Sequence, residues 1–209
     1  MRLSNSHRQF LLRATQQYAS RIGLAEDYLG TRGLSVDEAR QFHLGVVADP
    51  LPGHEAFANR LAIPYITPAG VVDIRFRAIN GEDPKYMGMV GAKTTMFNTQ
   101  ACFAADKYIC VTEGEFDAIV MSVKTEHPTV GIPGANNWKP HYSRILDDYD
   151  VVIILADGDN AGLEFAKKIS REVPNVNIIQ MLDGEDVNSM YLKHGKEWLD
   201  GRIRDCIAS

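Results

Sequence analysis

The chain has 209 residues, of which 45% are hydrophobic and 23% are charged, as is usual for a globular protein that buries a core. It has no apolar run near the ~20 residues of a membrane span and no signal-peptide core, so we expect a cytoplasmic protein with no membrane partner. Its three cysteines form no CxxC or Cys/His pattern, which argues against a zinc site and a disulfide framework.

The formal net charge of −5 is divided unevenly along the chain. Residues 1–100 contain 11 Lys and Arg against 9 Asp and Glu, whereas residues 101–209 contain 11 against 18, so their net charges are +2 and −7. This asymmetry suggests that the first half faces a polyanion. The basic excess is small, and two ordinary solvated faces explain it equally well.

The first half of the chain begins with helical patterns. A helix is predicted over residues 6–22, with Gly23 to end it, because these side chains recur at every fourth position: Phe10, Ala14, Tyr18 and Ile22. Two short helices follow within residues 25–45. A Ser35–Glu38 capping box starts the second of them, and Gly45 is expected to end it.

Residues 60–79 change to a period of two and predict two strands joined by a TPAG turn. Pro64 confines the first strand to an edge or a bulge. In the second strand Asp73, Arg75 and Arg77 share one face. Two arginines spaced in this way are able to clamp phosphates, although a solvent-facing edge strand shows the same periodicity. The glycine-rich segment after this pair, which contains Lys85, is predicted to be a loop over a site.

Strand and helix patterns alternate regularly from residue 108 onward. Strands are predicted at residues 108–111, 129–132, 151–156 and 177–181, with helices between and after them. This alternation predicts an α/β fold, with an open, mainly parallel sheet, helices on both faces, and ligands at the carboxyl ends of the strands. We therefore expect a small mixed α+β subdomain at residues 1–100, followed by the sheet domain at residues 101–209.

Two carboxylates leave the predicted strand over residues 151–156, in the sequence Asp157-Gly158-Asp159. Residues two apart in an extended chain point the same way, so both acids face one point. A divalent cation relieves the repulsion between them, and oxygen ligands suit Mg²⁺ or Mn²⁺. The alternative is a polar turn that leads into a helix capped by Asp159 or Asn160.

Acidic residues also follow two other predicted strands. Glu113 comes after the strand over residues 108–111, and Asp186 comes after the strand over residues 177–181. Glu113 alone is explained as an acid in the first turn of a helix, and Asp186 as a helix N-cap. Their joint placement with Asp157 and Asp159 at one sheet edge instead indicates a shared site.

The pairing of these motifs resembles the TOPRIM domain, which bacterial primases, type IA and II topoisomerases, OLD-family nucleases and RecR-type recombination proteins share. Its E-G-x-x-D motif is matched by Glu113, Gly114 and Asp117, and its D-x-D motif by Asp157 and Asp159. This pair of motifs is much more specific than D-x-D alone, and it implies a Rossmann-like TOPRIM fold for the second half.

The rest of the chain resembles the RNA polymerase core of DnaG-type primase of bacteria and phages. YLGTRGLSVDEARQFHLG and, less closely, IRFRAI match family segments, and a P-K-Y loop matches Pro84, Lys85 and Tyr86. The end of the family's L-x-D-G-E-D-P-D motif is matched by Asp183 to Asn188 with two changes. Val187 replaces the proline, and Asn188 replaces an aspartate that the family uses beside its metals.

The resemblance implies that the chain joins ribonucleotides into short RNA primers on single-stranded DNA, by nucleotidyl transfer with two or more Mg²⁺ or Mn²⁺ ions and no zinc. It implies these metal ligands: Glu113, Asp157, Asp159, Asp186 and Asn188. Glu113, Asp157, Asp159 and Lys85 become catalytic residues. Asp117 either caps its helix or orients the ligands without binding an ion itself. Phosphates of the template or of the nucleotide would be bound by Arg75, Arg77 and Lys85.

The implied partners are a single-stranded DNA template and ribonucleoside triphosphates, together with a replicative helicase or a separate zinc-binding subunit that reads the template. Because the family's zinc ribbon and helical bundle have no counterpart here, we expect a minimal core or an expressed fragment, in the bacterial or phage-host cytoplasm. The alternatives are a metal-dependent TOPRIM nuclease and a recombination-type TOPRIM module that binds DNA without chemistry.

Overall fold

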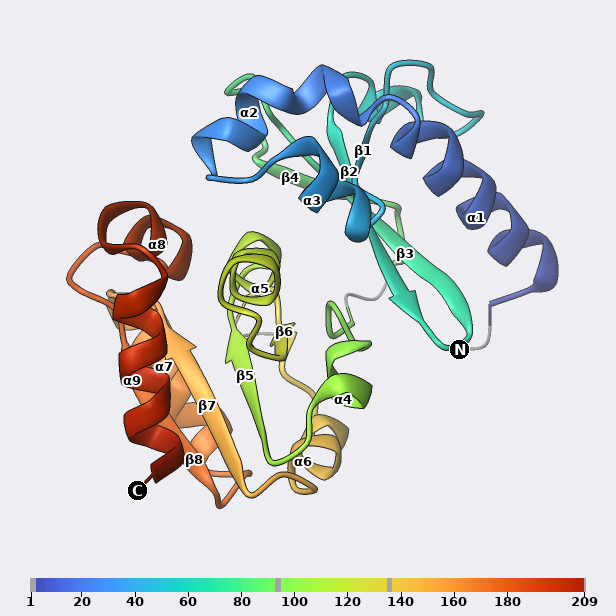
Figure 1. Cartoon of the computed structure of the whole chain (residues 1–209). Coiled ribbons are helices and arrows are strands. Elements are labelled where there is room, and N and C mark those ends of the chain that lie inside the picture. Colours follow the sequence, from blue (N-terminus) through green and yellow to red (C-terminus); the bar gives the residue numbers. More distant parts are fainter. Residues whose placement is uncertain (1–2, 93–94, 135–136, 209) are drawn as a thin grey trace. The chain divides into compact units, whose positions relative to one another are not determined.

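Figure 1 shows the chain as a computed structural model that describes residues 3–92, 95–134 and 137–208. It divides into two compact units, Met1–Thr94 and Thr95–Ser209. The sequence placed this division between residues 100 and 101. The structure assigns Met96 and Ala101 to a hydrophobic core of the second unit, and a bridge between Phe97 and Gly131 ties the same segment to that unit.

In its described part, the first unit packs helices against an antiparallel sheet in the order β1-β2-β3-β4. Side chains of α1 and β3 meet in one core, to which Leu11, Tyr18, Ile74 and Phe76 belong. The strands are β1 (Gly45–Val46), β2 (Leu61–Thr67), β3 (Gly70–Arg77) and β4 (Tyr86–Gly88). The helices are α1 (Asn5–Ala19), η1 (Ile22–Ala25), α2 (Glu26–Thr31), α3 (Val36–Gln41) and η2 (Glu55–Phe57).

Helix α1 ends at Ala19 rather than at the predicted residue 22, and Gly23 lies within the 3-10 turn η1 instead of ending a helix. Gly45 does not end α3, because it begins β1. A Cβ on Gly45 would lie 2.1 Å from the backbone carbon of Tyr18, so the strand crosses directly against the end of α1 and only glycine permits that approach.

The capping box and the proline of this unit follow the prediction. Ser35 Oγ accepts from the Glu38 N–H at 3.2 Å, and Glu38 Oε2 accepts from the Ser35 N–H at 2.8 Å. Strand β2 lies between β1 and β3, but β1 reaches only its first two residues. Pro64 therefore lies beyond the end of β1, where its missing N–H costs no ladder hydrogen bond, and a register shift follows at Tyr65.

The second unit contains a parallel sheet in the order β6-β5-β7-β8, and none of the described helices is long and apolar enough to cross a membrane. Its strands are β5 (Tyr108–Thr112), β6 (Thr129–Gly131), β7 (Val151–Ala156) and β8 (Val176–Gln180). Its helices are α4 (Ala101–Ala104), α5 (Glu115–Val120), the π-helical turn η3 (Met121–Thr125), α6 (His141–Leu146), α7 (Asn160–Ser170), α8 (Val187–His194) and α9 (Lys196–Ala208).

Helices cover both faces of this sheet. Alternate residues of β5 and β7 face opposite cores, because strand side chains alternate. One core contains Ile109, Val111, Val152, Ile154, Phe165 and Ile169, the last two from α7. The other contains Cys110, Ile153 and Leu155 with Met190 of α8 and Leu199 and Ile203 of α9. The predicted fold class, an α/β sheet domain preceded by a mixed α+β unit, is confirmed, and the buried sheet fixes the edge at which its strands end.

Candidate metal and nucleic-acid sites

The turn after β7 is held against the loop after β8. The Gly158 N–H donates to the Glu185 carbonyl at 2.7 Å, and the Gly184 N–H donates to the Gly158 carbonyl at 2.9 Å. A Cβ on Gly158 would lie 1.7 Å from the Leu182 carbonyl oxygen, so only glycine allows the two segments to approach this closely. The glycine between the two aspartates thus brings them to the loop that carries Asp186.

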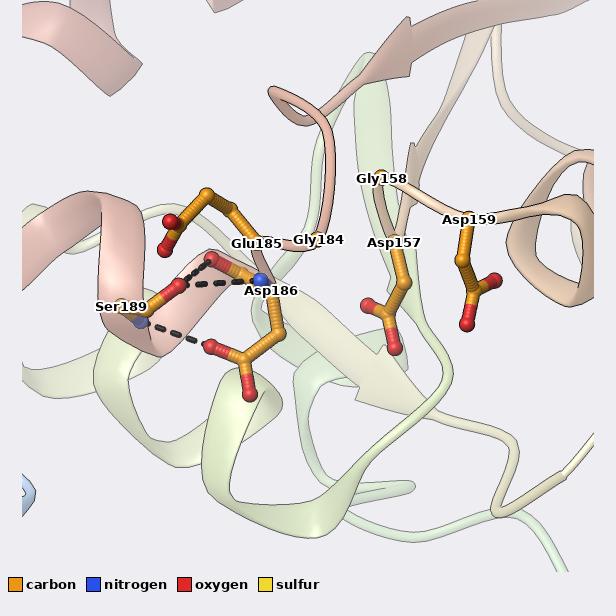
Figure 2. Close-up of a pocket in the computed structure, with 7 residues that line it drawn as sticks. All are labelled: Asp157, Gly158, Asp159, Gly184, Glu185, Asp186 and Ser189. Atoms are coloured by element: carbon orange, nitrogen blue, oxygen red, sulfur yellow. Dashed lines mark hydrogen bonds between the residues drawn. The ribbon is translucent and has the colours of Figure 1, made fainter.

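A pocket of about 240 Å³ lies at this edge, which is room for hydrated ions and a phosphate group. It is lined by Asp157, Gly158, Asp159, Gly184, Glu185, Asp186 and Ser189. In Figure 2 the carboxylates of Asp157, Asp159 and Asp186 extend toward the same side, whereas the Glu185 carboxylate turns away from them. Glu185 accepts a hydrogen bond from the Lys193 ammonium. The structure therefore gathers three of the predicted acidic residues, and Lys193 holds the fourth carboxylate of the pocket lining.

The helix caps that the sequence offered as the alternative roles of Asp159 and Asp186 are present. Asp159 Oδ1 accepts from the Gly162 N–H and caps α7, and Asp186 Oδ1 accepts from the Ser189 N–H and caps α8, each at 2.7 Å. Such caps contribute about 1 kcal/mol each. Because each cap uses one carboxylate oxygen, the second oxygen of each remains available to a cation.

Glu113 follows β5, the strand beside β7, as predicted. Its pKa is raised to about 7, chiefly by burial and next by the negative charges of Asp159 and Asp117, while a hydrogen bond from the Asp157 N–H partly opposes this rise. Within the described structure, its Oε1 atom is buried and has no hydrogen-bond partner. A carboxylate that is costly to ionise and has one unpartnered buried oxygen is what a nearby cation would stabilise.

In the part of the chain that the structure describes, no three His, Cys, Asp or Glu side chains converge on one metal position. Mutual repulsion keeps ionised carboxylates apart when no cation lies between them. The donors at this edge are oxygens, which suits Mg²⁺ or Mn²⁺ and not the sulfur and nitrogen sites of structural zinc. The residues fit a hard divalent cation by donor type and by the unsatisfied oxygen of Glu113.

Three residues of the predicted metal site lie outside the pocket lining: Glu113, Asp117 and Asn188. Asn188 is in the first turn of α8 and is only 1% exposed, and Asp117 in α5 is 7% exposed. Asp117 Oδ1 accepts a hydrogen bond from the backbone N–H of Asn188 at 3.0 Å. The predicted ligand role of Asn188 and the orienting role of Asp117 remain predictions at this point.

The predicted phosphate-binding residues lie in the first unit, where Lys85 is exposed in the loop between β3 and β4. Arg75 and Arg77 share a face of β3, as predicted. Because Arg77 is only 6% exposed, the alternative interpretation, that this face is a solvent-facing edge strand, is wrong for Arg77. Both guanidinium groups lie over the Tyr86 ring, at 4.3 Å for Arg75 and 4.9 Å for Arg77. Arg77 also donates to the Tyr86 hydroxyl.

This arrangement continues through residues that the sequence analysis missed. Arg77 and Arg32 both lie over the Tyr28 ring of α2, each at 5.8 Å, which makes an alternating ladder of Arg32, Tyr28, Arg77, Tyr86 and Arg75. The P-K-Y motif pointed to Tyr86, but no local pattern pairs it with α2.

The loop that carries Lys85 is held by a buried cation that the sequence analysis also missed. Arg60 Nη1 donates to the Pro84 carbonyl at 2.7 Å, and its Nη2 lies 3.9 Å from Glu82.

Comparison with known proteins places these features in context. A family model described as Toprim-like matches residues 110–191, which contain every predicted acidic ligand. The Gene 57 protein of Mycobacterium phage D29 is 45% identical over 148 residues, which cover 68% of this chain and 97% of that protein. This chain belongs to the family of that phage protein. It is a TOPRIM-domain protein that resembles the core of DnaG-type primase.

A DNA primase of Buchnera aphidicola is 24% identical to this TOPRIM protein over 172 residues, which cover 74% of the chain and 30% of that primase. The chain thus spans about a third of the length of the curated primase. The RNA polymerase domain of Mycobacterium tuberculosis primase DnaG, solved with double-stranded DNA, matches with a TM-score of 0.77 at 23% identity, over 98% of this chain and 81% of that one. Other similar structures include a DnaG catalytic domain bound to single-stranded DNA and a primase with its zinc-binding domain.

Proposed function

We propose that this chain synthesises short RNA primers on single-stranded DNA by metal-dependent nucleotidyl transfer. The observation that carries the proposal is the pocket at the carboxyl edge of a TOPRIM sheet, which Asp157, Asp159 and Asp186 line together, in a chain homologous to DNA primases. The fold alone does not decide the activity, since TOPRIM domains serve several reactions. The likeness of both units to primase cores favours priming over the nuclease and recombination alternatives.

In this proposal Glu113, Asp157, Asp159 and Asp186 hold two or more Mg²⁺ or Mn²⁺ ions, and Asn188 adds a neutral carbonyl oxygen. When bound, the ions activate the attacking 3′-hydroxyl and stabilise the leaving pyrophosphate. The caps that Asp159 and Asp186 make hold one oxygen of each carboxylate at a helix N-terminus, and the other oxygen of each is left for an ion. Ion pairing of Glu185 with Lys193 keeps that carboxylate from competing for the ions.

The ladder of the first unit is proposed to bind nucleic-acid or triphosphate phosphates. Lys85 and Arg75 reach solvent directly, whereas Arg77 adds positive charge from a buried position between two tyrosine rings. The tyrosines keep the guanidinium groups ordered, which lowers the entropy lost on binding. A replicative helicase or a separate zinc-binding subunit that reads the template is proposed as a further partner.

The test is to incubate the chain with single-stranded DNA, ribonucleoside triphosphates and Mg²⁺ or Mn²⁺, and to resolve the products by length. Template-dependent oligoribonucleotides are expected, and the Asp157→Asn variant should reduce them at least tenfold. Shortened template would instead identify a nuclease. DNA binding with neither product would identify a non-catalytic module.

A further inference from the structure

Two helices that begin beside the acidic pocket are joined at their first turns. Helix α5 starts directly after Glu113 and Gly114, and helix α8 starts directly after Asp186. The connection between them is the hydrogen bond from the Asn188 N–H to Asp117 Oδ1 at 3.0 Å, which spans 71 residues of sequence. We call this bond the α5–α8 clasp.

The Asn188 amide needs this partner. The first N–H groups of a helix have no carbonyl acceptor within the helix. The Asp186 cap satisfies Ser189, the next residue along, but not Asn188. Asn188 is 1% exposed, so water does not replace the missing acceptor, and a buried N–H without a partner destabilises the fold.

The glycine of the E-G-x-x-D motif makes room for the clasp. A Cβ on Gly114 would lie 2.3 Å from Asp117 Oδ2, and Gly114 has extended backbone angles that any residue adopts. Space for the Asp117 carboxylate therefore explains the glycine, and backbone strain does not. The same short segment thus connects Glu113, through Asp117, to the first turn of α8.

From this arrangement we propose that Asp117 is a positioning residue: through the clasp it holds Asp186 in register with Glu113, so that both reach the same divalent cations. The inference rests on the proposed metal role of the pocket. Asp117 acts through the Asn188 backbone, two residues beyond Asp186, and does not itself contact the ions. In the metal-free protein the clasp already sets the spacing of the two ligands.

The test compares Asp117→Asn with Asp117→Ala, because both remove the charge and only asparagine keeps an acceptor for Asn188. We expect the Mn²⁺ dissociation constant, measured by electron paramagnetic resonance, to be at least fivefold higher for the alanine variant. In an Asp186→Asn background the two should agree within twofold. Equal constants in the presence of Asp186 would overturn the proposal, as would a gap that persists without Asp186, since that identifies a direct ligand.

A second variant breaks the clasp without changing any charge and tests the proposal even if Asp117→Ala fails to fold. Gly114→Ala should displace Asp117, accelerate amide exchange at Asn188 at least tenfold in the metal-free protein, and weaken Mn²⁺ binding. Gly201→Ala, where an added Cβ meets nothing within 4 Å, is the control. Unchanged exchange and affinity in Gly114→Ala would overturn the proposal. Neither readout measures primer synthesis. If the variants behave as expected but the wild type makes no primers, only the proposed function is overturned.

Discussion

Glu113→Gln isolates the electrostatic cost of the candidate metal site, because the substitution keeps the shape of the side chain and removes its charge. The pKa of Glu113 is raised from 4.5 to about 7, chiefly by burial and next by Asp159 and Asp117. A rise of this size corresponds to about 3 kcal/mol against the ionised form in the folded state. Because Glu113 is partly exposed, solvent screening reduces this, and we expect about 1–2 kcal/mol.

The direction of the pH effect on stability depends on whether the folded or the unfolded chain holds the Glu113 proton more tightly. Below pH 4.5 the carboxyl group is protonated in both the folded and the unfolded chain, so Glu113 does not weaken the fold. As the pH rises from 4.5 through about 7, the unfolded chain ionises first, and the folded protein loses stability until both states are ionised. Glutamine removes this loss. The metal-free Glu113→Gln variant should therefore be more stable than wild type at pH 8.5 by about 1–2 kcal/mol and nearly equal at pH 4.

Urea denaturation in EDTA at the two pH values measures the effect, with Glu172→Gln as the control for an exposed carboxylate near the end of α7. Repeating the pH 8.5 series with Mg²⁺ should reverse the order, because the wild type gains more from the cation. The reasoning would be refuted if the stability of Glu113→Gln relative to wild type were the same at both pH values. So would a variant that is destabilised at pH 8.5 in EDTA.

Four outcomes are expected elsewhere in the chain. Asp159→Asn should keep the α7 cap and lose less than about 0.5 kcal/mol of unfolding free energy, while primer synthesis and Mn²⁺ binding fall at least tenfold. Lys85→Ala should weaken binding of single-stranded DNA in fluorescence anisotropy and reduce the slope of log K against log salt by about 0.7. Tyr86→Leu should weaken the same binding more than Tyr86→Phe, which keeps the ring between Arg75 and Arg77. Burial lowers the pKa of His54, so the folded protein resists protonation, and stability measured by urea denaturation should fall as the pH drops below 6.5. His54→Gln should flatten this fall.

Each of these outcomes has a clear contrary result. Full synthesis by Asp159→Asn at limiting Mg²⁺ would remove that residue from the metal site. An unchanged salt slope for Lys85→Ala would return the lysine to an ordinary solvated loop. Equal binding by the two Tyr86 variants would mean that the ring does not order the arginines. An equally steep fall in stability for His54→Gln would assign the pH dependence to other groups.

Much of the second unit could be predicted from the sequence because the signals are local. Short apolar runs predicted β5 and β7 as strands, and the structure buries nearly all of both. The carboxyl ends of parallel strands meet at one edge, so acids that follow those strands in the sequence had to gather there. The TOPRIM motif pair added the family. The short elements β4 and α4 were missed, since three or four residues are too few to show a period.

The sequence by itself determined which residues reach the sheet edge and which chemical groups they carry. Only the tertiary structure decided how those residues are held, because the deciding contacts join segments far apart in the chain. Gly158 is required by the Leu182 carbonyl, Asp117 bonds to the backbone of Asn188, and Arg77 is buried between Tyr28 and Tyr86. Such contacts leave no periodic trace, since a hydrogen bond or a ring contact depends on where two distant backbones meet and not on the spacing of residues within either one.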